Sequence, residues 1–241
     1  MDFSPFFRQY EELLKTADSV FEKVKHDCPN CVTCKTGCSD CCYALFDLTL
    51  VEALYINHHF NEKFSGTKKE NLITKANVAD RQIYKIKRQA YKELEAGKNE
   101  NDILEQVAHE RIRCPLLDEN NLCELYEHRP ITCRFYGVPT SIGGKGYTCG
   151  LSSFDKGKKY PTVNLDMIHR KLYDISAQLA DSIGSKYTQL SEMIVPISMS
   201  IVTVYNETFL GCADEKEVEQ PESNNKNGKD RVLNQAGDKN G

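Results

Sequence analysis

Apolar residues recur every three or four positions along three long stretches of the chain, which is the spacing of one face of an α-helix. The first stretch spans residues 4–25, where Ser4 and Pro5 suit a helix start. The second runs from Thr67 to residue 96 and stops at Gly97, and the third covers 164–183 and stops before Gly184. The pattern therefore predicts three long amphipathic helices, the second of them packed along its length on another helix.

Shorter helices are predicted between these stretches. Thr49 and Glu52 form a capping-box pattern that opens an apolar helix. His58 and His59 lie near its end; adjacent side chains on a helix diverge, so we expect a solvated or capping role rather than a joint metal site. Residues 102–111 form another short helix, and 189–210 form an apolar helix kinked at Pro196.

The stretch from Cys28 to Cys42 breaks this pattern. It carries six cysteines in the spacing C-x2-C-x2-C-x3-C-x2-C-C, with Gly37 and Ser39 favouring turns. Its apolar content is too low to bury a core of its own. We therefore expect a bound metal, an iron–sulfur cluster or disulfides to order it.

A second cysteine block covers residues 113–149. Asp118 to Asn121 form a turn between two short apolar runs, which predicts a small β-hairpin with Cys114 and Cys123 on its two arms. Arg129-Pro130 then breaks the chain before Cys133. The glycine-rich loop near Cys149 lacks the spacing of a phosphate-binding loop, so we interpret it as a plain loop.

Length and composition fit one domain. The chain has 241 residues, 40% of them apolar, which is enough for one core. Residues 213–241 contain almost no apolar side chains and are predicted to be a disordered tail. The prediction is thus a mainly α fold over residues 1–212, with a cysteine-rich metal-binding loop and a small β-hairpin.

Charge and cysteine usage narrow the classes of function. The net charge of −4 gives no overall basic field, so we expect no nucleic-acid partner. We see no signal peptide and no apolar run long enough to span a membrane, so we expect a cytoplasmic protein without a membrane partner. In that reducing compartment 11 cysteines indicate metal or redox chemistry more than disulfides, and an odd count excludes complete pairing.

Three features carry a resemblance to a known family. They are the Cys38-Ser-Asp-Cys41-Cys42 element, the helix with Glu52 that follows, and the block Cys-Pro-Leu…Cys-Glu-Leu-Tyr-Glu-His-Arg-Pro…Cys-Arg. Together they resemble the bacterial CxxCxxCC or YkgJ-like proteins, a zinc- or iron-chelating family, over a motif core of residues 28–150. Flagellin lysine-N-methylases look like distant relatives with a similar cysteine pattern. Two features depart from the motif: three residues separate Cys34 from Cys38, and Cys28 and Cys31 lie outside it.

The resemblance implies eight candidate metal ligands, which are Cys34, Cys38, Cys41, Cys42, Cys114, Cys123, Cys133 and Cys149. Zinc and iron–sulfur clusters usually take four thiolates, so eight thiols allow two sites, or one site with further thiols around it. The pattern and the resemblance favour an iron–sulfur cluster over Zn²⁺. Arg129 and Arg134 are candidate cofactor-binding residues, because guanidinium groups offset the negative charge of thiolates.

Three classes of function remain open on this basis. The first is a metal carrier or sensor, the second a cluster-dependent protein-modifying enzyme such as a lysine N-methyltransferase, and the third a structural zinc module that binds a protein partner. The sequence contains no Ser-His-Asp set, carboxylate pair or zinc-protease motif, so nothing in it supports hydrolysis.

Overall fold

The helix α2 lies between α1 and α6 on one side and α7 on the other in this computed structural model, which describes residues 1–212. The elements are α1 (Ser4–Asp27), η1 (Asp40–Tyr43), β1 (Asp47–Thr49), α2 (Leu50–Lys63), α3 (Gly66–Glu95), α4 (Glu100–Ala108), η2 (Tyr126–His128), α5 (Ile131–Phe135), β2 (Thr140–Ile142), β3 (Lys145–Tyr147), β4 (Val163–Asn164), α6 (Leu165–Ser182), η3 (Leu190–Glu192), β5 (Ile194–Pro196), α7 (Ile197–Val202) and α8 (Glu207–Leu210). The predicted mainly α fold is confirmed.

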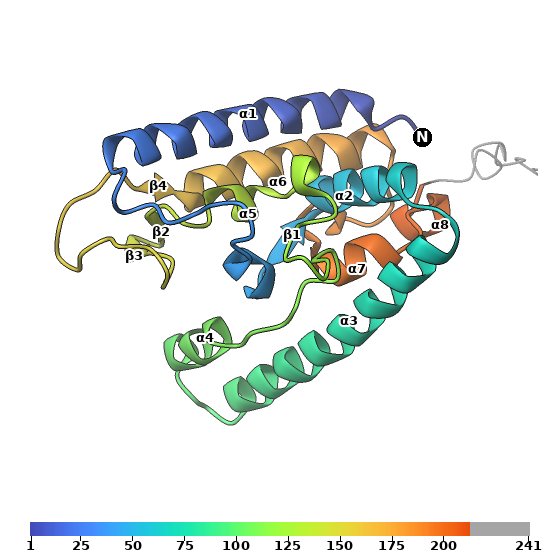
Figure 1. Ribbon diagram of the computed structural model, residues 1–241. Helices are drawn as coiled ribbons and strands as arrows, with labels where there is room; N and C mark the ends of the chain where they lie inside the picture. The colour runs from blue at the N-terminus through green and yellow to red at the C-terminus, as the bar shows by residue number, and fades with distance from the viewer. Residues whose placement is uncertain (213–241) are drawn as a thin grey trace, which may run out of the picture.

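Two hydrophobic cores share α2, whose residues 50–56 are all buried. On one side α1 and α6 lie side by side and pack on α2, with Tyr10 and Leu179 fully buried between them (Figure 1). On the other side α7 packs on both α2 and α3, and Phe60 of α2 and Ala76 of α3 belong to the same core. The cysteine segments are attached to both cores through the residues that flank them.

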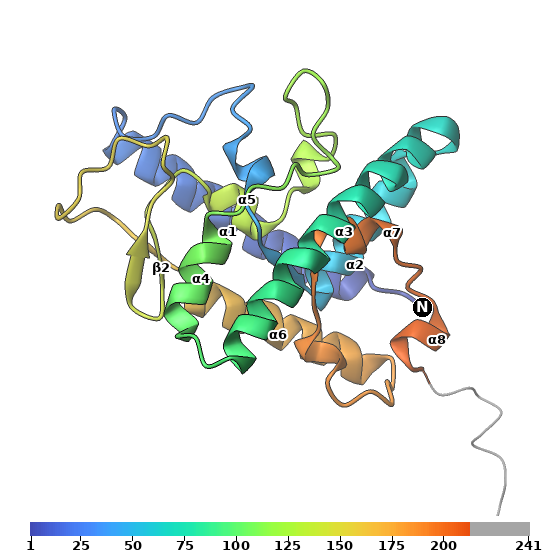
Figure 2. The ribbon, with the colours of Figure 1, turned by 90° about the horizontal axis from the view of Figure 1, so that it is seen from below.

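The helix starts follow the local sequence rules in part. Thr49 and Glu52 form the predicted capping box of α2, and Asn164 caps α6 by accepting from the backbone N–H of Met167. The predicted start of the second long helix at Thr67 is displaced slightly, because α3 begins at Gly66 after Ser65. Its apolar face is buried from Leu72 to Ile83, as predicted, but Leu94 near its end is 48% exposed. Beyond Ile83, α3 extends past the core and packs mainly on α4 (Figure 2).

The prediction of one kinked helix over 189–210 is wrong. The chain forms η3, β5, α7 and α8 there, and β5 pairs antiparallel with β1, where Asp47 lies opposite Pro196. Proline lacks an N–H and suits the end of this short strand, after which it becomes the N-cap of α7. Tertiary pairing with β1 therefore replaced the continuous helix that local apolar content favoured.

The small β-structure lies in two places. Strands β2 and β3 form an antiparallel hairpin, and β4 pairs parallel with β2, so the order is β3-β2-β4. The predicted hairpin at 114–123 is reduced to one bridge, between Leu117 and Cys123. Within the described residues, no helix has the length and apolar character of a membrane span. The predicted disordered tail lies outside the described residues.

Candidate metal centre

Five of the eight candidate cysteines line one small cavity of about 50 Å³. Its other walls are largely apolar and come from α2, α3 and the start of α7, with Ile56, Ala79 and Ile197 among the lining side chains. The five thiols come from three separate segments of the chain. We call them the cavity group: Cys41, Cys42, Cys114, Cys123 and Cys133.

Backbone hydrogen bonds bring the first two segments together. The Cys114 N–H donates to the Cys42 carbonyl over 2.7 Å, and the Ile112 N–H donates to the Tyr43 carbonyl over 3.1 Å. The turn after Cys114 is closed by Asp118, whose Oδ1 accepts from the N–H groups of two turn residues at 2.8 and 2.7 Å. The predicted turn thus reverses the chain and brings Cys123 back towards Cys114.

Cys133 reaches the cavity on the short helix α5. Ile131, two residues before it, donates its N–H to Glu52 over 3.3 Å. Glu52 is buried and also accepts from the Tyr10 hydroxyl at 3.2 Å and from the Thr49 N–H at 3.1 Å. One buried carboxylate thus connects α1, α2 and α5 and fixes the position of Cys133. Burial raises the pKa of Glu52, although these hydrogen bonds oppose the shift.

The cavity thiols interact strongly with one another. The thiols of Cys133 and Cys42, followed by the charge of Arg129, hold the pKa of Cys41 well below its usual range. The same contacts raise the pKa of Cys42 and Cys133. Burial raises the pKa of Cys114 to about 12. Thiols that share one site oppose one another's ionisation, so several thiolates in this group require a compensating positive charge.

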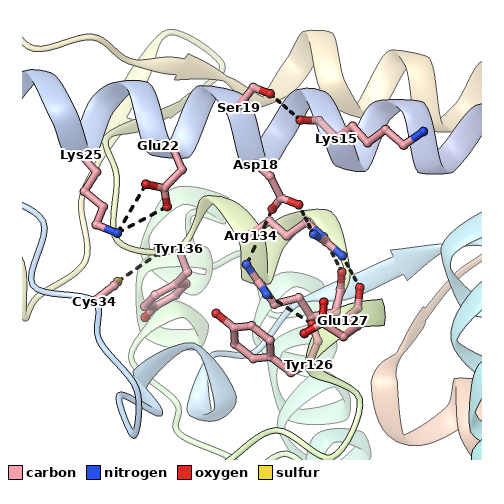
Figure 3. Close-up of polar contacts among 11 residues, drawn as sticks. Lys15, Asp18, Ser19, Glu22, Lys25, Cys34, Tyr126, Glu127, Arg134 and Tyr136 are labelled. Carbon is pink, nitrogen blue, oxygen red and sulfur yellow. Dashed lines mark hydrogen bonds and ion pairs between the residues drawn. The ribbon is translucent and has the colours of Figure 1, made fainter.

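The remaining three candidate cysteines form a second set, which we call the outer group: Cys34, Cys38 and Cys149. The Cys34 thiol donates to the Tyr136 carbonyl over 3.6 Å (Figure 3). Burial, followed by the negative charge of Cys38 and then of Cys149, raises the pKa of Cys34 to about 11. The Cys149 thiol donates to Asp40 over 3.4 Å. The two groups are adjacent, because Asp40, which accepts from the Cys149 thiol, directly precedes Cys41 in the chain.

Three cysteines lie outside the candidate set: Cys28 and Cys31 belong to the first cysteine segment, and Cys212 lies elsewhere, beside Met1. Cys28 caps the C-terminus of α1, and desolvation, followed by the charge of Cys31, raises its pKa. The Cys31 carbonyl accepts from the Ser153 N–H at 2.9 Å, which links the first cysteine segment to the loop after Cys149. The Cys212 thiol instead contacts the Met1 sulfur at 3.4 Å.

Both candidate arginines pair with Asp18 of α1, Arg129 at 3.7 Å, but their other contacts differ. Arg129 lines the cavity, stacks on Tyr126 with 4.1 Å to the ring centre, and its charge lowers the pKa of Cys41 and opposes the raised pKa of Cys123. Arg134 is buried, pairs with Asp18 of α1, and donates to the carbonyls of Arg129 and Glu127 at 3.0 and 2.6 Å (Figure 3). Arg129 thus faces the thiols, while Arg134 fixes α5 to α1.

Sequence reasoning missed several residues that shape this region. Asp40 accepts from the Cys149 thiol and pairs with Arg111, and it lies within the Cys38-Ser-Asp-Cys41 element itself. Its place between cysteines was a signal that could have been used. The cavity-lining Ile56, Ile83 and Ile197 are distant in sequence, and their helical spacing indicated only a core face.

Comparison with known proteins supports the resemblance found from the sequence. Residues 33–150 match the family model CxxCxxCC, described as "Putative zinc- or iron-chelating domain". No curated protein and no solved structure matches the chain, so the similarity to flagellin lysine-N-methylases stays a prediction. The matched residues include every member of the cavity group and of the outer group. The segment 33–150, on which all eight candidate thiols lie, therefore belongs to the CxxCxxCC family of metal-chelating domains.

Proposed function

We propose that the cavity group holds an iron–sulfur cluster through cysteine thiolates. The observation that carries this proposal is the convergence of five thiols, from three separate segments, on one apolar cavity. Four thiolates are enough for a cluster, and the apolar lining limits the access of water to it. When bound, the cluster would supply one-electron redox chemistry, and the cavity thiols would hold it in place.

Sulfur spacing favours a cluster over a single zinc ion. Thiolates at about 2.3 Å from one tetrahedral Zn²⁺ lie about 3.8 Å from one another. In residues 1–212, no three thiol sulfurs lie within 4.8 Å of one another. The one group of three potential ligand atoms in this range that are this close consists of two histidines and a glutamate. A four-iron cluster needs wider spacing, because each thiolate binds a different iron atom. The cavity thiols would therefore have to move a shorter distance towards one another to bind a four-iron cluster than to bind a single zinc ion.

Arg129 supports a thiolate centre electrostatically. Four thiolates bring a large negative charge into a partly buried site, and the Arg129 guanidinium lies beside the thiols that would carry it. We assign the outer group to the surroundings of this single centre, where Cys34 and Cys149 are hydrogen-bonded to protein oxygens. The expected content is therefore one cluster per chain.

The size of the cavity bears on the class of function. Clefts that hold a drug-sized substrate or cofactor have volumes of roughly 300–1,000 Å³, whereas this cavity measures about 50 Å³. Its volume favours a closed centre for electron transfer, sensing or structural stabilisation over a methyltransferase site. We also infer that residues 1–212 fold as one domain, since Pro196 and Ser198 line the same cavity as the cysteines of the family-matched segment.

The test is metal and acid-labile sulfide analysis, with an absorption spectrum, of the full chain purified without oxygen. We expect a brown protein with about four iron and four sulfide per chain, the content of a [4Fe–4S] cluster. The Cys212→Ser variant is the matched control, because Cys212 lies outside both groups. A colourless protein with stoichiometric zinc would show that the site holds zinc and not a cluster. A protein that binds neither metal would overturn the proposal altogether.

A further inference from the structure

A second group of metal-binding side chains lies on the last two turns of α2, outside the cysteine cavity. Nε2 of His58 lies 3.3 Å from Oε1 of Glu62, and Nδ1 of His59 lies 3.0 Å from Oε2 of the same carboxylate. The three residues each present a ligand atom within 4.8 Å of the others. The two adjacent histidines were expected to diverge, but both rings turn towards Glu62, which lies three and four positions further along the helix.

Neighbouring rings hold the two imidazoles in this arrangement. His59 stacks on His128 of η2, with ring centres 3.6 Å apart, and meets Tyr55 edge to face at 4.4 Å. Its Nε2 is buried without a hydrogen-bond partner among the described residues, so Nδ1 is the nitrogen that remains available to an ion. His58 packs beside Phe7 of α1, with ring centres 5.3 Å apart.

We propose that His58, His59 and Glu62 bind a divalent first-row transition ion such as Zn²⁺, at a site independent of the cysteine centre. Two imidazole nitrogens and a carboxylate suit Zn²⁺, Co²⁺ and Ni²⁺. Three protein ligands leave a position for water, as in open zinc sites. The side chains of His58 and Glu62 are 48% and 59% exposed, so an ion can enter from solvent and both side chains can adjust around it.

The ligand chemistry separates this site from the cysteine centre. Its donors are nitrogen and oxygen, whereas the cavity group offers sulfur, and none of the three residues is among those that line the cavity. Cobalt bound to thiolates gives intense near-ultraviolet charge-transfer absorption, and cobalt bound to nitrogen and oxygen gives weak visible bands alone. One titration can therefore report on each site separately.

The experiment titrates Co²⁺ into the full chain whose cysteine centre is already loaded, and then adds Zn²⁺ as a competitor. We expect one additional Co²⁺ with weak visible bands, no new thiolate charge transfer, and displacement by Zn²⁺. Loss of one ligand in His58→Ala or Glu62→Gln should weaken binding by at least about tenfold. The matched control is His26→Ala, because His26 also contacts a carboxylate, that of Asp27, without a third ligand.

Three results would overturn the inference: no additional Co²⁺ bound, new thiolate charge transfer, or equal weakening in His26→Ala. Circular dichroism of His58→Ala and Glu62→Gln checks that both variants fold, which their exposure leads us to expect. The absorption of the loaded cysteine centre is followed in the same samples. Failure of the proposed cluster and failure of this second site are therefore distinguished.

Discussion

The cavity group and the outer group differ in what surrounds their cysteines. Two of the cavity cysteines lie two positions from a fully buried apolar residue, Cys123 before Leu125 and Cys133 after Ile131. Two outer cysteines stand beside exposed glycines, Gly37 before Cys38 and Gly150 after Cys149, whereas Cys34 packs against the core. The hydrophobic cores therefore position the first group, whereas in the second group Cys149 is held by a polar contact to Asp40, and Cys34 by core packing together with a contact to the Tyr136 carbonyl. Metal ligands that lie close in sequence to buried core residues are therefore held in place before the metal binds.

The largest expected effect separates the two groups directly. Cys133→Ser should weaken the metal centre and lower its iron content, because serine is a poor ligand for a soft metal ion and the four remaining cavity thiols would have to rearrange to replace Cys133. Cys149→Ser should retain the metal centre. Since metal binding contributes folding free energy, Cys133→Ser should also lower the melting temperature. Iron, zinc and sulfide analysis of both variants checks this, and equal metal loss in the two would contradict the division.

A second prediction concerns the carboxylate that positions Cys133. Glu52→Gln places an amide N–H₂ where donors from Thr49, Tyr10 or Ile131 now point, which leaves a buried polar group without a partner. We expect a loss of about 2 kcal/mol in the free energy of unfolding. Urea denaturation of the metal-free variant measures it, and Glu12→Gln on the exposed face of α1 is the control. A loss no larger than that of the control would show that Glu52 does not hold α5.

Gly137 tests the outer group alone. It has φ of +105°, and an added Cβ would lie 2.3 Å from the Cys34 sulfur. Gly137→Ala should therefore displace Cys34 and cost about 1–3 kcal/mol, while the cavity group keeps its metal. Gly146→Ala is the matched control, since a methyl group added there would meet no atom within 4 Å. Thermal melting and metal analysis measure the two effects; metal loss in Gly137→Ala would mean that the groups form one centre.

The two arginines should separate charge compensation from packing. Arg129→Ala should speed metal loss to a chelator by about tenfold, because the charge beside the thiolates is removed. Arg134→Ala should lower the free energy of unfolding instead, because Arg134 is buried and donates to two backbone carbonyls in addition to the Asp18 ion pair that it shares with Arg129. Chelator kinetics and urea denaturation of both variants give the comparison. If the effects were reversed, Arg134 would compensate the thiolate charge and Arg129 would stabilise the fold.

The smallest effect is a pH dependence at Glu52. Its pKa is raised in the folded protein because burial disfavours the carboxylate. The folded state thus binds this proton more tightly than the unfolded state, so the group's contribution is fully present below the unfolded pKa and lost as pH rises through the folded pKa. As pH rises through the folded pKa, the unfolding free energy of the parent should therefore fall relative to that of Glu52→Gln, by about 1.4 kcal/mol for each pH unit by which the folded pKa exceeds the unfolded one. Denaturation from pH 4 to 7 measures it, and a constant difference would contradict the raised pKa.

Much of the helical fold was predictable because it depends on local spacing. The capping box of Thr49 and Glu52 and the cap at Asn164 are contacts within one helical turn, so the sequence contains all their partners. The segment 189–210 was mispredicted because its partner, β1, lies about 150 residues earlier, and no local signal reveals that pairing. The eight candidate ligands followed from their spacing and the family resemblance, and their use as ligands stays a prediction.

The long helices, the family motif and the soft-ligand chemistry can all be read from the amino-acid sequence, because they depend on residue type and on spacing along the chain. Three features required the folded structure: which thiols share a cavity, that Arg129 faces them while Arg134 joins α5 to α1, and that His58 and His59 converge on Glu62. Each of these depends on side chains meeting across segments or on rotamers fixed by neighbouring rings. Such contacts are settled by packing of the whole chain, which residue spacing does not encode.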